Sequence, residues 1–183
     1  MNQGLISRRY ASALWMYAKK NGQEDRVYAE TNLLSSSFTK YAPLKRVLSN
    51  PILSREKKLA VVTMIAGQDV SEVFRNFLQL LFANKRDEFL RTICLSYETI
   101  YLKEKKILKA SLITAIPVDA TMEQRIIQKI EKSTGHTIRL TSAVNPAILG
   151  GCIITVDTWR LDSSVTTQLK RIKESLLETA NNF

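Results

Sequence analysis

Several features that enzymes and membrane proteins commonly carry are scarce in this sequence of 183 residues. It contains one histidine, two cysteines, six glycines and four prolines. No run of apolar residues approaches the roughly 18 that a membrane-spanning helix needs. Residues 1–10 lack the apolar core of a signal peptide. We therefore expect a chain with no spanning helix, no secretory leader and no Pro/Gly-rich linker.

The side chains that carry most enzymatic chemistry are too few to form a site. A triad of the Ser-His or Cys-His kind would have to use His136, which follows Gly135 in a predicted helix-to-strand turn. Cys94 and Cys152 have apolar neighbours and no metal-binding spacing. We interpret both cysteines as small, reduced hydrophobic residues. The sequence predicts no catalysis, no cofactor and no metal.

The glycine pair Gly150-Gly151 is the one feature that superficially resembles a phosphate-binding loop. The Lys and Ser/Thr of a P-loop do not follow it, and the dinucleotide-binding pattern is also missing. Adjacent glycines in a strand are typical of a bulge or of closely approaching backbones. We therefore predict a structural role for both glycines.

Positive charge is concentrated in the first part of the chain. Residues 1–106 carry 18 Lys and Arg against 10 Asp and Glu, whereas residues 107–183 carry 9 against 7. The total of +10 suggests an acidic partner surface, a nucleic acid or an anionic lipid. Charge alone leaves all three open.

The first 106 residues show helical periodicity with clear breaks between the segments. Ser54 and Ser71 are predicted N-caps, Gly67 is a predicted C-terminal stop, and Asn50-Pro51 is a predicted break. The predicted helices cover residues 5–20, 24–39, 43–48, 54–66, 71–84 and 87–106. Helices joined by short loops form bundles, so we expect a six-helix bundle over residues 1–106.

The pattern changes near Ile107 to β-branched runs and shorter segments. We predict strands at residues 108–118, 138–144, 148–156 and 159–161. A helix that Asp119 or Thr121 caps and Gly135 ends separates the first two strands. An amphipathic helix carrying Val165, Leu169, Ile172 and Leu176 closes the chain. The expected fold class is a two-domain α + α/β protein with a small sheet domain of two helices over residues 107–183.

Two predicted helices have unusually wide apolar arcs, of roughly 200°, about twice what one core contact needs. In the first, the arc spans Ile6, Tyr10, Ala11, Ala13, Leu14, Trp15, Tyr17 and Ala18. In the fifth, it spans Val73, Phe74, Phe77, Leu78, Leu80, Leu81 and Phe82. Both helices are either buried on most sides or face the bundle with one part and a partner's helix with the other.

Several segments, in order along nearly the whole chain, resemble the delta subunit family of the F-type ATP synthase, which includes the mitochondrial oligomycin sensitivity conferral protein. The similar segments are RYASAL at 9–14, NPILSREKK at 50–58, FLQLLFANKR at 77–86, NPAILGG at 145–151 with Ile153, and LDSSV at 161–165 with Leu169.

This resemblance implies a non-catalytic stator subunit that links the catalytic head to the peripheral stalk, so that rotation is coupled to ATP synthesis by proton transport. Residues 1–106 would bind the N-terminal helix of the alpha subunit, and residues 107–183 would bind the peripheral-stalk b subunits. The protein would be peripheral, without direct membrane insertion, at the cytoplasmic face of the bacterial plasma membrane.

The resemblance also assigns expected roles to individual residues. The residues expected to bind the helix of the alpha subunit are Tyr10, Ala11, Leu14, Ala18, Phe74, Phe77, Leu78 and Leu81. The expected structural residues of the second domain are Gly150, Gly151, Asp162 and Ser163. The apolar stripe of the last helix is either a stalk contact or a cover for the sheet.

Two alternatives stay open at this point. A basic nucleic-acid-binding helical module is suggested by the charge, although the basic residues are scattered and the predicted strands carry no aromatic platform. A stand-alone scaffold that binds helices of other proteins is the second alternative.

Overall fold

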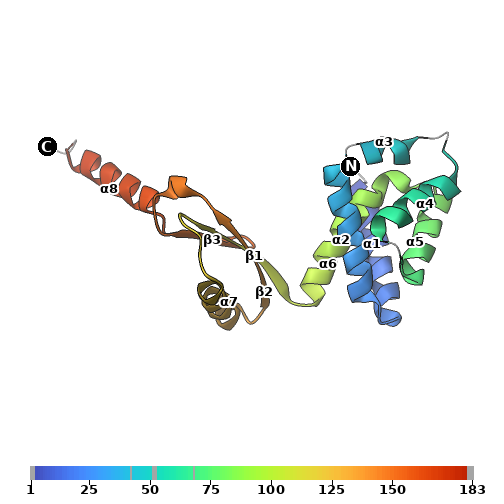
Figure 1. The fold of residues 1–183 in the computed structure, drawn as a ribbon, viewed down its shortest axis with the longest axis horizontal. Coiled ribbons are helices and arrows are strands. Elements are labelled where there is room, and N and C mark those ends of the chain that lie inside the picture. Colours follow the sequence, from blue (N-terminus) through green and yellow to red (C-terminus); the bar gives the residue numbers. More distant parts are fainter. Residues whose placement is uncertain (1–2, 42, 51–52, 68, 181–183) are drawn as a thin grey trace. The chain divides into compact units, whose positions relative to one another are not determined.

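The computed structural model describes residues 3–41, 43–50, 53–67 and 69–180 (Figure 1). The chain divides into two compact units, Met1–Lys105 and Lys106–Phe183. The first is helical and the second contains a small mixed sheet, as the sequence predicts. The sequence predicts a boundary between residues 106 and 107, one residue after the boundary in the structure, which falls between residues 105 and 106. Pro51, part of an expected break, lies outside the described residues.

The described helices of the first unit begin and end close to the predicted positions. They are α1 Gln3–Lys20, α2 Glu24–Lys40, α3 Pro43–Ser49, α4 Arg55–Ala66, α5 Glu72–Ala83, the 3₁₀ helix η1 Asp87–Phe89, and α6 Leu90–Glu104. The prediction for residues 87–106 is wrong at both ends, because residues 87–89 form the separate 3₁₀ turn and the α-helix stops at Glu104.

Side-chain caps explain where two of these helices start. The hydroxyl of Ser54 accepts a hydrogen bond from the Lys57 amide at 3.4 Å, and the hydroxyl of Ser71 accepts one from the Phe74 amide at 3.3 Å. Both caps satisfy amides that have no partner within the helix. Gly67 ends α4 with a φ of 141°, as predicted.

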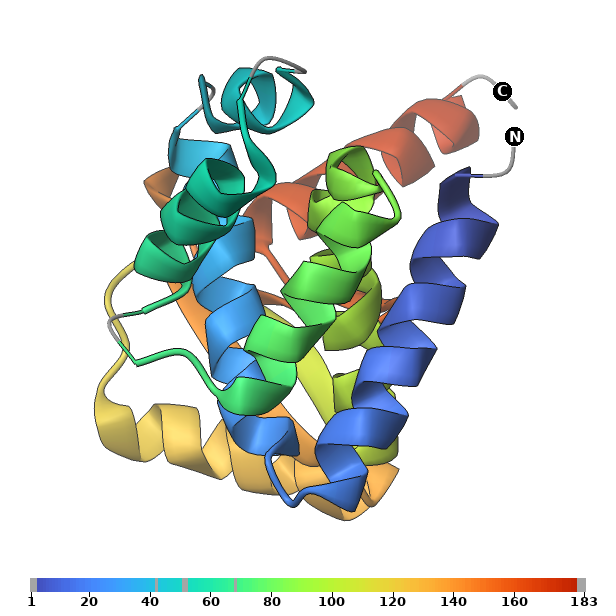
Figure 2. The same ribbon diagram turned by 90° about the vertical axis from the view of Figure 1, so that its right-hand side faces the viewer.

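The core of the helical unit is mainly apolar. Helix α6 packs against α1 and α2, and α5 packs against α1 and α4. Figure 2 shows this arrangement from one side. Each helix contributes its buried stripe to this core, where close packing stabilises the fold. The fully buried large side chains are Leu14, Val27, Leu34, Val62, Phe74, Leu78, Leu81, Leu90, Ile93 and Tyr97.

A buried carboxylate fixes the first turn of α5. Glu30 of α2 is 5% exposed and accepts hydrogen bonds from the amide and the hydroxyl of Ser71, at 2.6 and 2.7 Å. Arg26 places its Nε 3.6 Å from the same carboxylate. A negative charge at a helix N-terminus interacts favourably with the helix dipole. The contact therefore anchors the start of α5 to α2.

A second cluster ties the last residue of the helical unit to α2. The Lys105 ammonium lies 3.2 Å from a Glu24 carboxylate oxygen and 3.0 Å from one of Asp25. The Tyr101 hydroxyl donates to Asp25 at 2.8 Å and its ring stacks on Tyr28, with the centroids 4.0 Å apart. The hydrogen bonds from Lys105 and Tyr101 lower the pKa of Asp25. The exit from α6 is thus held to the start of α2.

The second unit is built on a four-stranded sheet in the order β2-β1-β3-β4. The elements are β1 Ile107–Thr114, α7 Ala120–Thr134, β2 Thr137–Val144, the 3₁₀ helix η2 Pro146–Ile148, β3 Cys152–Val156, β4 Trp159–Asp162, and α8 Val165–Ala180. Strands β1 and β2 are parallel and are joined through α7, whereas β3 and β4 add as antiparallel neighbours.

The predicted ends of α7 are confirmed, but two predicted strands are shorter. Asp119 caps α7 by accepting from the Met122 amide at 3.0 Å, and Gly135 ends it in the left-handed conformation. Strand β1 stops at Thr114, before Pro117 could interrupt the ladder. The third predicted strand, 148–156, begins only at Cys152, because the chain turns through Leu149 with a φ of 63°.

Gly150 and Gly151 therefore lie in a bend before β3 and not inside a strand. Gly151 has a φ of 75°, and a Cβ built on it would lie 2.2 Å from the Ser163 carbonyl oxygen. Ser163 in turn donates its amide to the Cys152 carbonyl at 2.9 Å. The Asp162 carboxylate accepts from the Ser164 amide and hydroxyl, at 3.1 and 2.7 Å. These contacts join the bend to the start of α8.

We predict that Gly151→Ala destabilises the sheet unit more than Gly135→Ala does. Both positions have positive φ, which costs an alanine about 1 kcal/mol, but a Cβ at Gly135 meets nothing within 4 Å. The added clash in Gly151→Ala should lower the free energy of unfolding by about 3 kcal/mol or more. Hydrogen exchange of the sheet amides measures the loss of unfolding free energy in both variants. Equal losses would contradict the close approach to Ser163.

Candidate functional site

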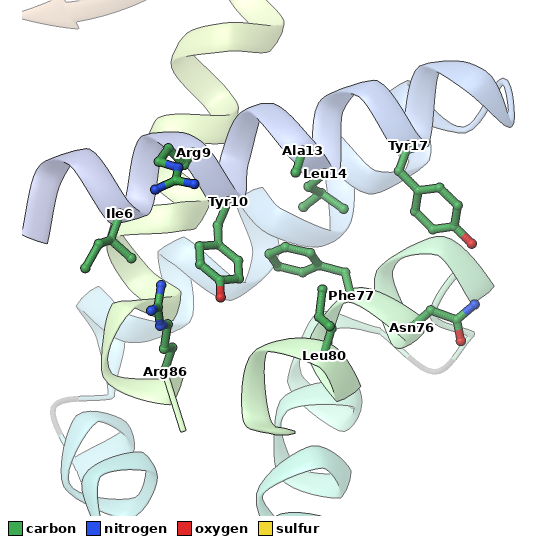
Figure 3. A pocket seen from close by; sticks show the side chains of 10 residues that line it. All are labelled: Ile6, Arg9, Tyr10, Ala13, Leu14, Tyr17, Asn76, Phe77, Leu80 and Arg86. Atoms are coloured by element: carbon green, nitrogen blue, oxygen red, sulfur yellow. The ribbon is translucent and has the colours of Figure 1, made fainter. Parts of the chain in front are cut away.

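The surface of the helical unit has a groove between α1 and α5 (Figure 3). Its volume is about 690 Å³. The two helices run in opposite directions, so Tyr17 and Asn76 lie at one end and Ile6 and Arg86 at the other. The lining residues are Ile6, Arg9, Tyr10, Ala13, Leu14, Tyr17, Asn76, Phe77, Leu80 and Arg86.

The middle of the groove is aromatic and aliphatic. The Tyr10 and Phe77 rings meet edge to face, with centroids 6.3 Å apart and planes at 69°. Leu14 and Phe77 are buried against the core, but Leu80 is 55% exposed and Tyr17 is 42% exposed. Exposed large apolar side chains beside an apolar hollow are typical of a protein-binding surface.

The Ile6 end of the groove is basic. The Arg86 guanidinium lies 5.4 Å from the centre of the Tyr10 ring, in cation–π geometry. The Asn84 amide group donates to the Tyr10 hydroxyl at 3.4 Å. Arg9 projects from α1 at the same end (Figure 3). The lining is therefore apolar in the middle and positive at one end.

The structure separates the predicted contact residues into two groups. Tyr10, Leu14 and Phe77 line the groove together. The other five have no exposed surface and form part of the core, so a segment lying in the groove would not reach them. These core residues are Ala11, Ala18, Phe74, Leu78 and Leu81. The width of an apolar arc does not reveal which part of the arc is covered by neighbouring helices. In this structure the neighbouring helices cover the five core residues.

The groove also contains residues that the sequence argument did not select. Arg9 and Arg86 fall within the segments 9–14 and 77–86 that carry the family resemblance, but their charge placed them outside an apolar stripe. Ile6, Ala13, Tyr17 and Leu80 lie on the wide arcs and could have been chosen from them. Asn76 had no signal in the sequence.

A second exposed apolar surface lies on α8. The stripe of Val165, Leu169, Ile172 and Leu176 is 37%, 54%, 57% and 66% exposed. In the sheet unit α8 contacts η2, and it does not cover the sheet (Figure 1). Of the two interpretations of this helix, the structure therefore excludes the sheet cover. The exposed stripe is free to contact another chain.

The histidine and cysteines of the described residues do not gather into a metal site. The described residues contain no group of three or more His, Cys, Asp or Glu placed to hold a metal ion. The His136 ring nitrogen Nδ1 lies 2.7 Å from the Thr134 carbonyl oxygen, in the turn after α7. Burial raises the pKa of the Cys94 thiol to about 12. No helix in the described ranges is both long and apolar enough to span a bilayer.

Known proteins resemble the chain over nearly its full length. The sequence pattern of the ATP synthase delta (OSCP) subunit family matches residues 6–176. The chain is 39% identical to an ATP synthase subunit delta of Parabacteroides distasonis, covering 97% of this chain and 99% of the relative. It is 38% identical to one of Bacteroides thetaiotaomicron, covering 97% of each.

A solved structure supports the fold independently of close sequence similarity. A chain in the cryo-EM structure of the Toxoplasma gondii mitochondrial ATP synthase hexamer matches with a TM-score of 0.65 at 24% identity. The match covers 94% of this chain and 97% of that one. At this identity the similarity establishes the fold.

We predict that α5 tolerates a carboxylate at Leu80 but not at Leu78. Leu78→Asp would bury an unpaired charge in the core and should lower the free energy of unfolding by about 3–5 kcal/mol, whereas exposed Leu80→Asp should cost less than about 1 kcal/mol. Urea denaturation of the two variants, followed by circular dichroism, compares them. Similar losses would contradict the placement of Leu80 at the open groove.

Proposed function

The chain belongs to the ATP synthase delta (OSCP) subunit family, and from this premise we propose how its two units act. It is a stator subunit of the F-type ATP synthase, the complex that couples ion transport to ATP synthesis. We propose that the helical unit holds the catalytic head and that the sheet unit holds the peripheral stalk. On this proposal the subunit has no active site of its own and works only through binding.

The groove between α1 and α5 is the proposed site for the N-terminal helix of the alpha subunit. The observation that carries this proposal is the open apolar hollow, in which Leu80 and Tyr17 remain exposed beside the buried Leu14 and Phe77. An amphipathic helix binds such a groove by placing its apolar face into it. Docking would remove the exposed apolar area from water, which favours association.

The exposed stripe of α8 is the proposed site for the b subunits. Ile172 and Leu176 lie one helical turn apart on the same face of α8, and each is more than half exposed. A helix with one apolar face and one charged face pairs readily with another helix through that apolar face. Helices of the stalk would give this stripe a partner that the sheet unit itself does not provide.

This arrangement gives each end of the link its own surface. The groove belongs to the unit 1–105 and the stripe to the unit 106–183. The two partners would therefore bind without competing for the same residues. We place the protein peripherally in the complex, at the cytoplasmic face of a bacterial plasma membrane. Family membership gives the nucleic-acid-binding alternative no support.

We predict that Leu80→Asp weakens binding of the alpha subunit's N-terminal peptide without unfolding the helical unit. The carboxylate would lose its hydration inside the filled groove, which should weaken binding at least about tenfold. Met64→Asp on α4 is the matched control, because Met64 is 82% exposed and lies outside the groove. Calorimetric titration of both variants measures the affinities. Wild-type affinity for Leu80→Asp would refute docking in the groove.

We predict that Ile172→Asp weakens binding of the C-terminal region of the b subunits and leaves the alpha peptide's affinity unchanged. Ile172 is 57% exposed, so the substitution should not disturb the fold. Leu80→Asp is the reciprocal control and should keep full affinity for the b subunits. Pull-down of purified b subunits with both variants tests the assignment. If both variants lost the same partner, the division of labour between the two units would be wrong.

A further inference from the structure

The two ends of the groove between α1 and α5 differ in charge, and its apolar middle does not explain this difference. Of the lining residues, the only charged ones are Arg9 and Arg86, and both lie at the Ile6 end (Figure 3). At the other end the lining residues are Tyr17 and Asn76, which are uncharged. A site that only had to bury an apolar helix face would not need two guanidinium groups at one end.

Neither guanidinium is paired with a carboxylate among the described residues. Asp87, the acid next to Arg86 in the sequence, is instead paired with the ammonium of Lys58. The Arg86 guanidinium lies over the Tyr10 ring in cation–π contact, which holds it beside the groove. An arginine fixed in this way has donors available for a carboxylate without losing much side-chain entropy.

We propose that Arg9 and Arg86 bind an acidic side chain of the docked alpha-subunit helix and so fix its register in the groove. This inference rests on the proposed function, because it concerns the same occupant. An apolar groove alone tolerates a helix shifted by one turn, since its contacts are not directional. A charge pair at one end discriminates between such positions.

The proposal predicts a salt-dependent loss of affinity in Arg86→Gln. The variant should bind the alpha subunit's N-terminal peptide about fivefold more weakly at low salt, and the difference should shrink at high salt, where exposed charges are screened. Arg86→Lys should retain most of the salt-dependent part of the affinity for the peptide, because lysine keeps the positive charge. Thermal melts of both variants check that the helical unit stays folded.

Arg75→Gln is the matched control, since Arg75 lies on α5, is exposed and does not line the groove, whereas Arg86 follows the end of α5. It should bind the peptide like the wild type at both salt concentrations. Equal losses in Arg75→Gln and Arg86→Gln would overturn the proposal, because they would reflect general charge attraction. Wild-type affinity of Arg86→Gln at low salt would overturn it as well.

The source of the negative charge is tested by changing each acidic residue of the peptide in turn to its amide. One of these peptides should bind the wild type more weakly but lose no further affinity with Arg86→Gln. If no acidic residue is coupled to Arg86 in this way, the helix dipole or another group supplies the attraction and the proposal is wrong. If the unmodified peptide does not bind the wild type at all, it is the proposed function that fails. If it binds and Leu80→Asp weakens binding as predicted while Arg86→Gln has no effect, only the register inference fails.

Discussion

The hydrogen bonds from Ser71 to the buried carboxylate of Glu30 decide where α5 begins, and the groove depends on that position. The carboxylate accepts both the amide and the hydroxyl of Ser71, so the first turn of α5 is held against α2. From this anchor, α5 runs with Phe74, Leu78 and Leu81 in the core. Its apolar arc is wider than the core can cover, which leaves Leu80 exposed beside α1.

A stator link must hold its partners against torque, and the structure offers rigid surfaces for this purpose. Helices α1 and α5 are each packed against the core along one side, so the groove between them is preformed. Preformed sites bind without a cost for ordering the binding surface. The cluster of Lys105 with Glu24 and Asp25 closes the helical unit at its last residue. The end of α6 is therefore fixed to the start of α2.

Local signals in the sequence were sufficient for most helix ends. Ser54 and Ser71 cap their helices as predicted, and of the two predicted candidates for α7, Asp119 is the cap, because each cap needs only a side chain and the backbone three residues on. The bend at 149–151 was predicted as strand. In this bend Leu149 and Gly151 have positive φ values, and Gly151 approaches the Ser163 carbonyl, a contact that local sequence patterns do not report.

The candidate site shows the same division between local and tertiary information. Periodicity identified α1 and α5 as the helices with surplus apolar surface. It could not tell that Ala11, Ala18 and Leu78 face inward while Leu80 faces outward, because this depends on how neighbouring helices cover the arc. Likewise, the spacing of α8 predicted its stripe but not that the sheet would leave it uncovered.

Site-specific photo-crosslinking in the assembled ATP synthase tests the central claim most directly. A photoreactive phenylalanine analogue placed at Leu80 lies in the groove, whereas one placed at Met64 lies on an exposed part of α4 outside it. The account predicts that the Leu80 probe crosslinks to the N-terminal segment of the alpha subunit and that the Met64 probe does not. A Leu80 probe that crosslinks to a different subunit, or to none while the complex is intact, would contradict it.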